Sequence, residues 1–242
     1  MLLKEEKRRL AAEALGTGFL LAVVVGSGIM GERLAGGNVA VTLLANALAT
    51  GAGLAALILA LGPVSGAHFN PVVTLMAAFD KAMPWSRVPG YIAAQILGAL
   101  AGTAAADFMF GLPLFFPSHR VRTGASQWFS EFAATVGLLL VIKGCSRSRP
   151  GAVPFAVSAY IVAAYWFTSS TSFANPAVTL ARTLSDTFAG IRPWDAPGFI
   201  AAQAAALGFS MVFLNWLLPA GSPGESARAG DGKKEKQYVH AG

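Results

Sequence analysis

Charged side chains are scarce in this chain of 242 residues, because only 12% of the residues are Asp, Glu, Lys or Arg. Soluble domains carry about 25% charged residues, so this shortage argues against a protein that is surrounded by water. Apolar residues make up 55% of the chain, and the mean hydropathy is +0.57. We therefore expect the chain to lie in a membrane and to have membrane lipid as a partner.

Cysteine and histidine are also rare. A single cysteine, Cys145, excludes a disulfide within one chain, and the three histidines, His68, His119 and His240, are scattered. No spacing typical of metal ligands or of a catalytic nucleophile occurs. The sequence therefore predicts no catalytic residues, no metal and no cofactor, and an enzyme is not expected.

The net charge of +6 does not indicate a nucleic-acid partner, because apolar runs separate the Lys and Arg residues instead of leaving them on one face. Six apolar runs are long enough to be candidates for spanning a hydrocarbon core about 30 Å thick. They lie at about residues 10–30, 39–61, 88–110, 128–143, 152–168 and 197–218. The fourth and fifth runs are short for a full span.

Each half of the chain also carries an Asn-Pro motif, namely Asn70-Pro71-Val72 and Asn175-Pro176-Ala177. Asn before Pro is typical of a helix start, because the Asn carboxamide caps free N–H groups and Pro lacks the donor that would go unsatisfied. The apolar runs that follow, 72–79 and 177–184, would each extend roughly 12 Å at about 1.5 Å per residue. We predict two half-helices that meet at the middle of the membrane.

Other residues repeat together with the motifs. Glu13 in the first span matches Glu131 in the fourth, and the segment 90–95 matches 198–203. Because each copy has three spans, an odd number, the second copy begins on the opposite side of the membrane from the first. We therefore predict an inverted repeat with units of about 10–110 and 126–218. Gly98 and Gly102 have the spacing that lets helices approach closely in membranes.

The positive charges predict the orientation. With six spans, 13 Lys and Arg residues fall on one side of the membrane and 5 on the other, and the richer side is expected to be cytoplasmic. Both termini then lie in the cytoplasm, as a short segment 1–9 and a disordered tail 219–242. We expect the plasma (inner) membrane.

These features together resemble the aquaporin and aquaglyceroporin family, also called the major intrinsic proteins. The resemblance runs from about Glu13 to Leu218 and is carried by the run from Ser65 to Thr74, the second Asn-Pro-Ala motif and the repeated Glu and Ala-Gln positions. It implies an all-α membrane protein in which residues 10–218 form a bundle of six tilted helices and two re-entrant half-helices. It also implies one pore per protomer and a homotetramer.

Four side chains near the outer mouth set selectivity in this family, and the resemblance implies three of them here. They are Thr50 in the second span, Ser172 in the second re-entrant loop and Val178 after the second motif. The family normally has Arg at the last position, so an isopropyl group replaces a fixed guanidinium. The fourth residue, in the fifth span, stays open between Ala163, Ala164 and Tyr165.

Three charged residues allow more than one interpretation. Glu13 and Glu131 lie in apolar spans, where a carboxylate suggests proton coupling, but the resemblance implies that they hold backbone groups of the re-entrant loops. Arg182 lies one helical turn after Val178. It either supplies a displaced positive charge in the vestibule, pairs with Asp186, or is solvated at a helix end.

A constriction of Thr, Ser and Val should be wider and less repulsive to cations than a water-selective filter. The sequence therefore predicts a passive channel for water and small uncharged solutes, such as glycerol, urea, hydrogen peroxide or neutral metalloid hydroxides. The opposed N-termini of the half-helices, each with about half a positive charge, would exclude protons. A water-selective aquaporin and, less favoured, an ion-coupled secondary transporter are the alternatives.

Overall fold

The structure is a computed structural model that describes residues 2–218, and these residues contain helices and loops but no β-strand. The predicted tail 219–242 lies outside the described residues. The helices, including three short 3-10 helices η1 to η3, are α1 (Leu2–Leu34), α2 (Val39–Ser65), α3 (Pro71–Phe79), η1 (Trp85–Arg87), α4 (Val88–Met109), α5 (Ala125–Ser148), η2 (Pro150–Ala152), α6 (Val153–Phe167), α7 (Pro176–Arg182), η3 (Pro193–Asp195) and α8 (Ala196–Leu217).

Six of the described helical segments are long and apolar enough to cross a membrane, and each coincides with one predicted span, although three of these spans end one residue after the helix. The ends differ most for α1, which begins at Leu2 instead of residue 10, and for α5, which covers Ala125–Ser148 instead of 128–143. Hydropathy marks only the apolar part of a helix. Lys, Glu and Arg are good helix formers, so both helices continue into polar sequence.

The two half-helices α3 and α7 begin at the prolines of the Asn-Pro motifs. Asn70 and Asn175 have extended backbones, and their side chains accept hydrogen bonds from the first free N–H groups. This is the geometry that an Asn cap followed by Pro favours. Helix α7 ends at Arg182, slightly before the predicted end at residue 184, because Thr183 is already its C-cap.

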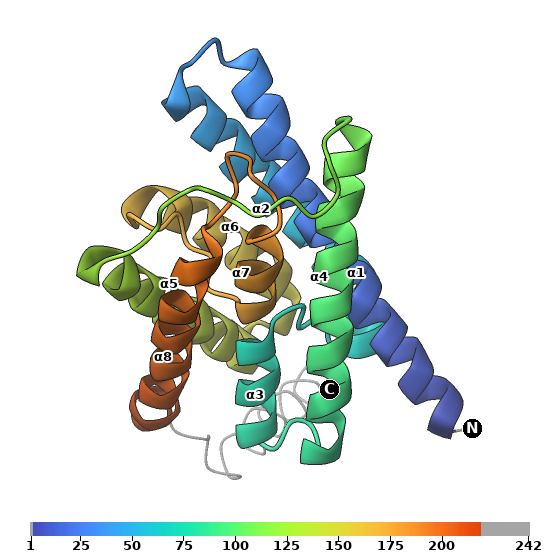
Figure 1. The fold of residues 1–242 in the computed structure, drawn as a ribbon. Helices are drawn as coiled ribbons and strands as arrows, with labels where there is room; N and C mark the ends of the chain where they lie inside the picture. Colours follow the sequence, from blue (N-terminus) through green and yellow to red (C-terminus); the bar gives the residue numbers. More distant parts are fainter. Residues whose placement is uncertain (1, 219–242) are drawn as a thin grey trace, which may run out of the picture.

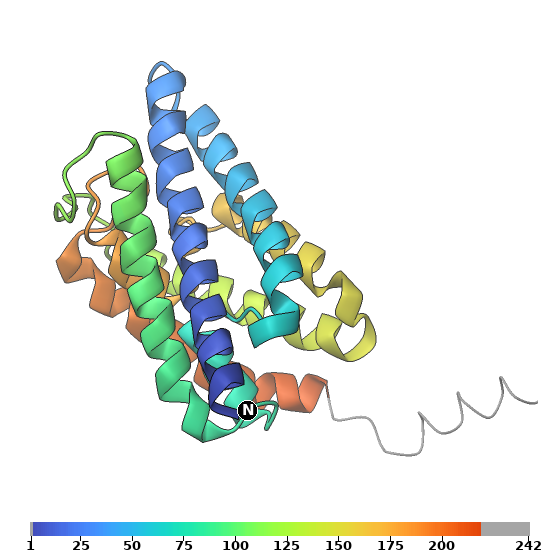
Figure 2. The same ribbon diagram turned by 90° about the vertical axis from the view of Figure 1, so that its right-hand side faces the viewer.

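The halves of the chain are built alike around the two half-helices. Helix α1 packs against α2 and α4, whereas α5 packs against α6 and α8. Figure 1 shows α7 above α3, between these two groups of helices. The start of α1 and the end of α8 lie at the same end of the bundle (Figures 1 and 2). The fold is therefore the predicted bundle of six spanning helices and two half-helices.

Two glycines allow α1 and α4 to pack backbone against backbone. A Cβ atom at Gly98 would lie 2.1 Å from the carbonyl oxygen of Ala14, and one at Gly102 would lie 1.9 Å from that of Gly18. Real Cβ atoms do not approach so closely. Because membrane helices associate mainly by close packing, this contact positions α4 and the loop that precedes it.

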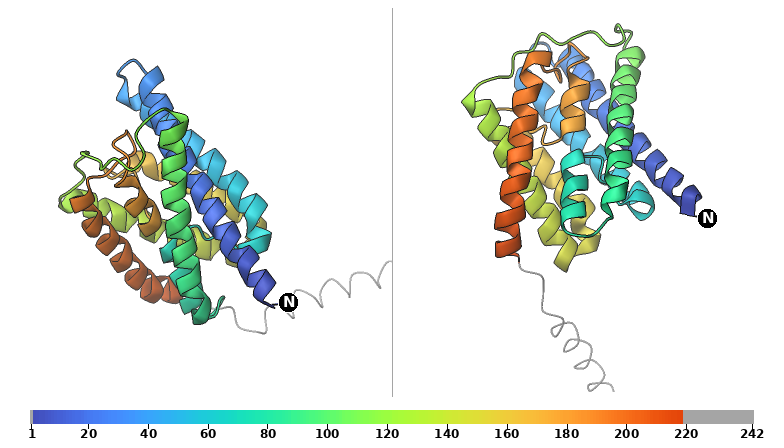
Figure 3. Two further views of the ribbon diagram at one scale, coloured as in Figure 1. Left: turned by 45° about the vertical axis from the view of Figure 1, so that its right-hand side comes forward. Right: turned by 60° about the horizontal axis from the view of Figure 1, so that its bottom comes forward.

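The loop 110–124 crosses over the α7 end of the molecule (Figure 3). The Ser118 N–H donates to the Thr183 carbonyl at 2.9 Å, and the Arg192 N–H donates to the Arg120 carbonyl at 2.7 Å. These backbone bonds attach the loop to the segment that follows α7. The loop therefore covers the end of the bundle toward which the second half-helix points.

Candidate pore and its constrictions

A cavity of about 670 Å³ runs between the two halves of the fold. Its lining includes, from one end through the middle to the other, Asp80, Lys143, Asn215, Asn70, Asn175, Val178, Thr50, Tyr165 and Arg182. At the first end, the Lys143 ammonium donates to both Asp80 carboxylate oxygens and to Asn215 Oδ1, each at 2.7 Å. One space thus connects the α3 end of the bundle with the α7 end.

In the middle of the cavity, Asn70 and Asn175 connect the two repeats. Each Oδ1 caps its own half-helix, as in the 2.9 Å bond from the Val72 N–H to Asn70. Each Nδ2 donates to the loop of the other repeat: Asn70 to the Ala174 carbonyl and Asn175 to the Phe69 carbonyl, both at 2.7 Å. These crossed hydrogen bonds tie the two half-helices together at their N-termini.

The loop before α3 is held by the carboxylate of Glu13, which is fully buried in α1. Glu13 accepts hydrogen bonds from the N–H groups of His68 at 3.0 Å and Phe69 at 2.8 Å, and from the Ser65 hydroxyl at 2.7 Å. Phe69 has a left-handed backbone, with φ of 48°, which a bulky residue adopts only under constraint. The buried acceptor supplies that constraint.

The loop before α7 repeats this construction with Glu131, which is also fully buried. Glu131 accepts from the N–H groups of Phe173 at 2.9 Å and Ala174 at 2.8 Å. Ser172 and Ala174 have φ values of 51° and 47°. Each repeat therefore uses one carboxylate in a membrane-spanning helix to hold a strained backbone turn.

A glutamine and a threonine extend each network, and neither threonine was predicted to have a role in the site. Gln95 Nε2 donates to Glu13 at 2.8 Å and to the Thr74 hydroxyl at 2.9 Å. The second repeat has the same two bonds, at 2.8 and 3.0 Å, among Gln203, Glu131 and Thr179. Both threonines come four residues after the motif Asn, and this shared spacing is the signal that could have found them.

At the α7 end, Thr50 on α2 and Tyr165 on α6 line the cavity, and their hydroxyls lie 3.2 Å apart, within hydrogen-bond distance. Of the three candidates in the fifth span, Tyr165 is the one found in the cavity lining, whereas Ala163 is exposed and Ala164 is buried outside it. Among the three candidates, Tyr165 is therefore the one that lies beside Thr50 in the cavity lining.

Ser172 and Val178 line the cavity beside these residues. Both are buried, and the Ser172 hydroxyl bonds to no other group in the part of the chain that the structure describes. An apolar isopropyl group and a free hydroxyl therefore line the same part of the cavity.

Arg182 does not pair with Asp186 and is not solvated at the end of α7, so both of these predictions are wrong. Its side chain is 2% exposed, and its guanidinium carbon lies 3.4 Å from the centre of the Phe173 ring. Its Nε donates to the Ala189 carbonyl. Side chains on a helix point back toward its N-terminus, so Arg182 is directed into the bundle and lines the cavity.

Asp186 instead bonds to the loop above it. Its carboxylate accepts from the N–H and the imidazole Nδ1 of His119, both at 2.9 Å. Burial acts to raise the pKa of Asp186, but these bonds and one from Ser118 outweigh it, and the pKa lies below its ordinary value. Asp186 thus anchors the covering loop.

Nowhere in residues 2–218 do three His, Cys, Asp or Glu side chains gather in a way that could hold a metal ion.

Comparisons with known proteins agree with this architecture. The family model described as major intrinsic protein matches residues 3–153, more than half of the chain. The aquaglyceroporin AqpS of Rhizobium meliloti (strain 1021) is 50% identical over 216 residues, which are 89% of this chain and 92% of that protein. Aquaporin NIP1-3 of Oryza sativa subsp. japonica is 30% identical over 85% of this chain and 73% of its own length.

A solved structure has the same fold. The aquaglyceroporin from Plasmodium falciparum superposes with a TM-score of 0.61 at 20% sequence identity, over 88% of this chain and 98% of that one. The matched family consists of passive channels, not of enzymes. This chain belongs to the major intrinsic protein family of membrane channels.

Proposed function

We propose that this protein is a passive channel for water and small uncharged solutes: glycerol, urea, hydrogen peroxide or neutral metalloid hydroxides. The main support is the cavity of about 670 Å³, whose lining includes both motif asparagines and Val178. The similarity to a protein named an aquaglyceroporin supports solutes larger than water.

The asparagines are well placed to guide such solutes. Asn70 and Asn175 line the cavity, and the bond from each Nδ2 to the opposite loop uses only one of its two hydrogens. The second hydrogen is then donated to a passing hydroxyl or carbonyl oxygen. The N-termini of α3 and α7 carry partial positive charge, which disfavours a proton on a chain of water molecules at this point.

The outer constriction sets which neutral solutes pass. Thr50, Ser172 and Val178, joined by Tyr165, offer hydroxyl groups on one part of the lining and an apolar surface on another. A polyol presents the same combination, because its hydroxyl groups need hydrogen-bond partners and its carbon skeleton does not. The lining groups and the width together determine the barrier.

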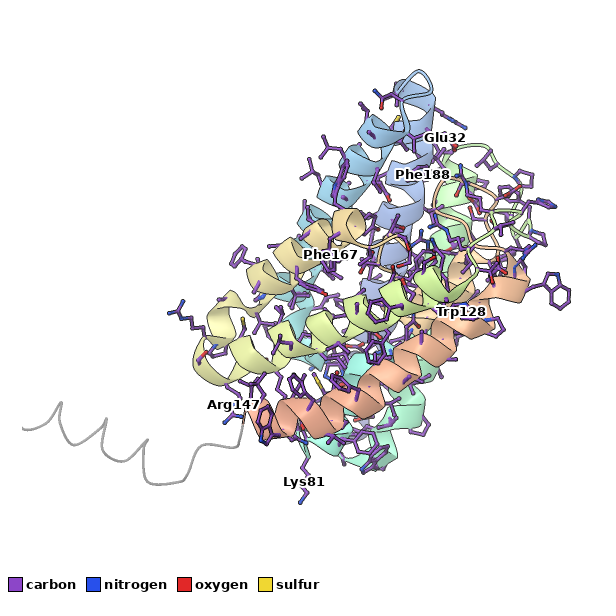
Figure 4. All side chains as sticks on the ribbon, turned by 90° about the vertical axis from the view of Figure 1, so that its left-hand side faces the viewer. Glu32, Lys81, Trp128, Arg147, Phe167 and Phe188 are labelled. Atoms are coloured by element: carbon purple, nitrogen blue, oxygen red, sulfur yellow. The ribbon has the colours of Figure 1, made fainter. Side chains whose placement is uncertain are left out.

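The assembly and orientation are part of the proposal. We infer a homotetramer in the plasma (inner) membrane, with both termini in the cytoplasm and one pore in each protomer. The charge distribution supports this orientation. Lys81 and Arg147 lie at one end of the bundle, and Glu32 and Phe188 lie at the other (Figure 4).

Solute uptake into proteoliposomes tests the proposal. Vesicles with the wild-type protein are challenged in turn with sucrose, glycerol and urea, and volume changes are followed by stopped-flow light scattering. We expect fast re-swelling in glycerol or urea. In Val178→Arg, entry of glycerol should fall by about tenfold or more, because a guanidinium narrows the constriction and adds polar groups that hold water.

The control variant is His119→Arg, which adds the same side chain on the exposed loop outside the cavity, beside Asp186. Its glycerol uptake should match that of the wild type. Water flux without glycerol or urea entry in the wild type would instead assign the protein to the water-selective class. Uptake that requires an ion gradient would indicate a coupled transporter.

A further inference from the structure

Arg182 is the buried charge that the proposed function leaves without a role. It lies at the C-terminal end of α7, 2% exposed, and contributes to the cavity lining beside Tyr165 and Val178. The Phe173 ring lies 3.4 Å from its guanidinium carbon, and its Nε donates to the Ala189 carbonyl. These contacts fix the direction of the side chain.

Arg182 makes one hydrogen bond among residues 2–218, through its Nε, and no carboxylate there forms an ion pair with it, so its two terminal nitrogens have no protein acceptor. A buried guanidinium without a protein acceptor is costly unless water or a solute bonds to it. An ionisable group at membrane depth indicates a functional site by default. The unpartnered nitrogens therefore belong to the cavity, where permeating molecules pass.

Arg122 provides the contrast within the same region. Its guanidinium carbon also lies near the Phe173 ring, at 5.2 Å. However, its nitrogens donate to the carbonyl oxygens of Gly190, Ser170 and Phe188 at 2.8 to 3.3 Å. Arg122 is not part of the cavity lining. Arg122 thus holds the outer loops with all the nitrogens of its guanidinium, whereas Arg182 uses only its Nε in this way.

We propose that Arg182 is a selectivity-determining residue, which supplies from one helical turn farther along α7 the cationic hydrogen-bond donor that Val178 does not provide. In this position it excludes cations and donates hydrogen bonds to the oxygens of neutral solutes. The inference rests on the proposed channel function. It also changes the expectation that Val178 leaves the outer constriction without a positive charge.

The physical reason is the weak screening inside the bundle. A positive charge close to the path of a cation raises the free-energy barrier to its passage much more at an effective dielectric constant of about 20 than in water. Cation exclusion here would then have two sources, namely the half-helix N-termini at the middle and Arg182 above them. Neutral solutes carry no charge to be repelled, so the same group serves them as a donor.

The test measures sodium and proton entry into vesicles under an imposed membrane potential, with glycerol uptake recorded on the same preparations. The neutral variants Arg182→Gln and Arg182→Met should admit sodium or protons on the order of tenfold faster than the wild type, or more. Arg182→Lys keeps the positive charge, so the channel with this substitution should still exclude sodium and protons. Adding Val178→Arg to Arg182→Gln should restore exclusion.

Arg33→Gln is the matched control, because it removes a positive charge from an exposed residue at the α7 end, outside the cavity. It should stay as tight as the wild type. Two neutral replacements are used so that failure of one to fold leaves the other, and the Tm and the circular dichroism of each purified variant in detergent identify the folded ones. Folded neutral variants that exclude sodium and protons as well as the wild type would overturn the inference. Absence of glycerol and urea uptake in the wild type is a separate result that rejects the proposed function.

Discussion

Single buried polar residues hold the strained turns of this channel. Glu13 and Glu131 are fully buried, yet each carboxylate accepts hydrogen bonds from two backbone N–H groups and from the side-chain amide of one glutamine. Hydrogen bonds to a charged group are stronger than neutral ones. These bonds offset the cost of left-handed φ angles at residues such as Phe69 and Ala174.

Replacing one carboxylate by an amide should therefore destabilise the protein. In Glu131→Gln, an NH₂ group would face one of the donors that now bond to a carboxylate oxygen, leaving at least one buried donor without an acceptor. We expect the free energy of unfolding to fall by about 3 kcal/mol. Thermal unfolding of the purified protein in detergent measures this as a lower Tm.

Glu5→Gln, at an exposed position near the start of α1, should leave the Tm unchanged. Equal Tm values for Glu131→Gln and the wild type would show that the buried carboxylate is dispensable for the loop.

Residue roles could be predicted from the sequence where the two repeats duplicate them. The motif asparagines and the paired Glu positions occur twice, so each copy supported the other. Tyr165 and Arg182 have no counterpart in the first repeat. Their side-chain directions depend on the packing of the fifth span and on the position of Phe173. The spacing of residues along the chain does not predict these directions.

At the level of elements, close backbone contact decides where the helices lie. Six spans and two half-helices could be predicted, because length and hydropathy are properties of each segment alone. The Gly98 and Gly102 spacing also indicated a close helix contact, but not that α1 would be the partner. Helix ends were predicted less well, since polar helix formers extend α1 and α5 beyond their apolar parts.

Gly102→Ala should break the contact between α1 and α4. The added methyl group would overlap the backbone of Gly18 at 1.9 Å, so the helices must separate. We expect a loss of about 3 kcal/mol or more, at the upper end of overpacking effects. Gly208→Ala is the control, because a Cβ there meets no atom within 4 Å. Denaturation in detergent should show a large decrease in Tm for the first variant and none for the second.

At the level of the whole molecule, the inverted repeat places the two half-helices on opposite sides of the midplane. The start of α1 and the end of α8 lie at the same end of the bundle (Figure 2). Lys81 and Arg147 share that end (Figure 4). An excess of positive charge favours the cytoplasmic side, which supports the proposed orientation.

The only cysteine of the chain, Cys145, allows this orientation to be tested. It is half-buried near the end of α5 that carries Arg147, so a membrane-impermeant maleimide should label it only after the cells are permeabilised. His119→Cys in a Cys145→Ala background should be labelled on intact cells, because the His119 side chain is 88% exposed. The reverse pattern would invert the proposed topology.

The crossed hydrogen bonds between Asn70 and Ala174 and between Asn175 and Phe69 join residues 104 and 106 positions apart. A ribosome that adds about 5 to 20 residues per second needs roughly 5 to 20 s to make the missing partner. During synthesis the first re-entrant loop therefore lacks, for this time, the hydrogen-bond partners of Asn70 Nδ2 and of the Phe69 carbonyl. The biogenesis of this protein thus has a late closing step, in which the second half of the chain completes the first.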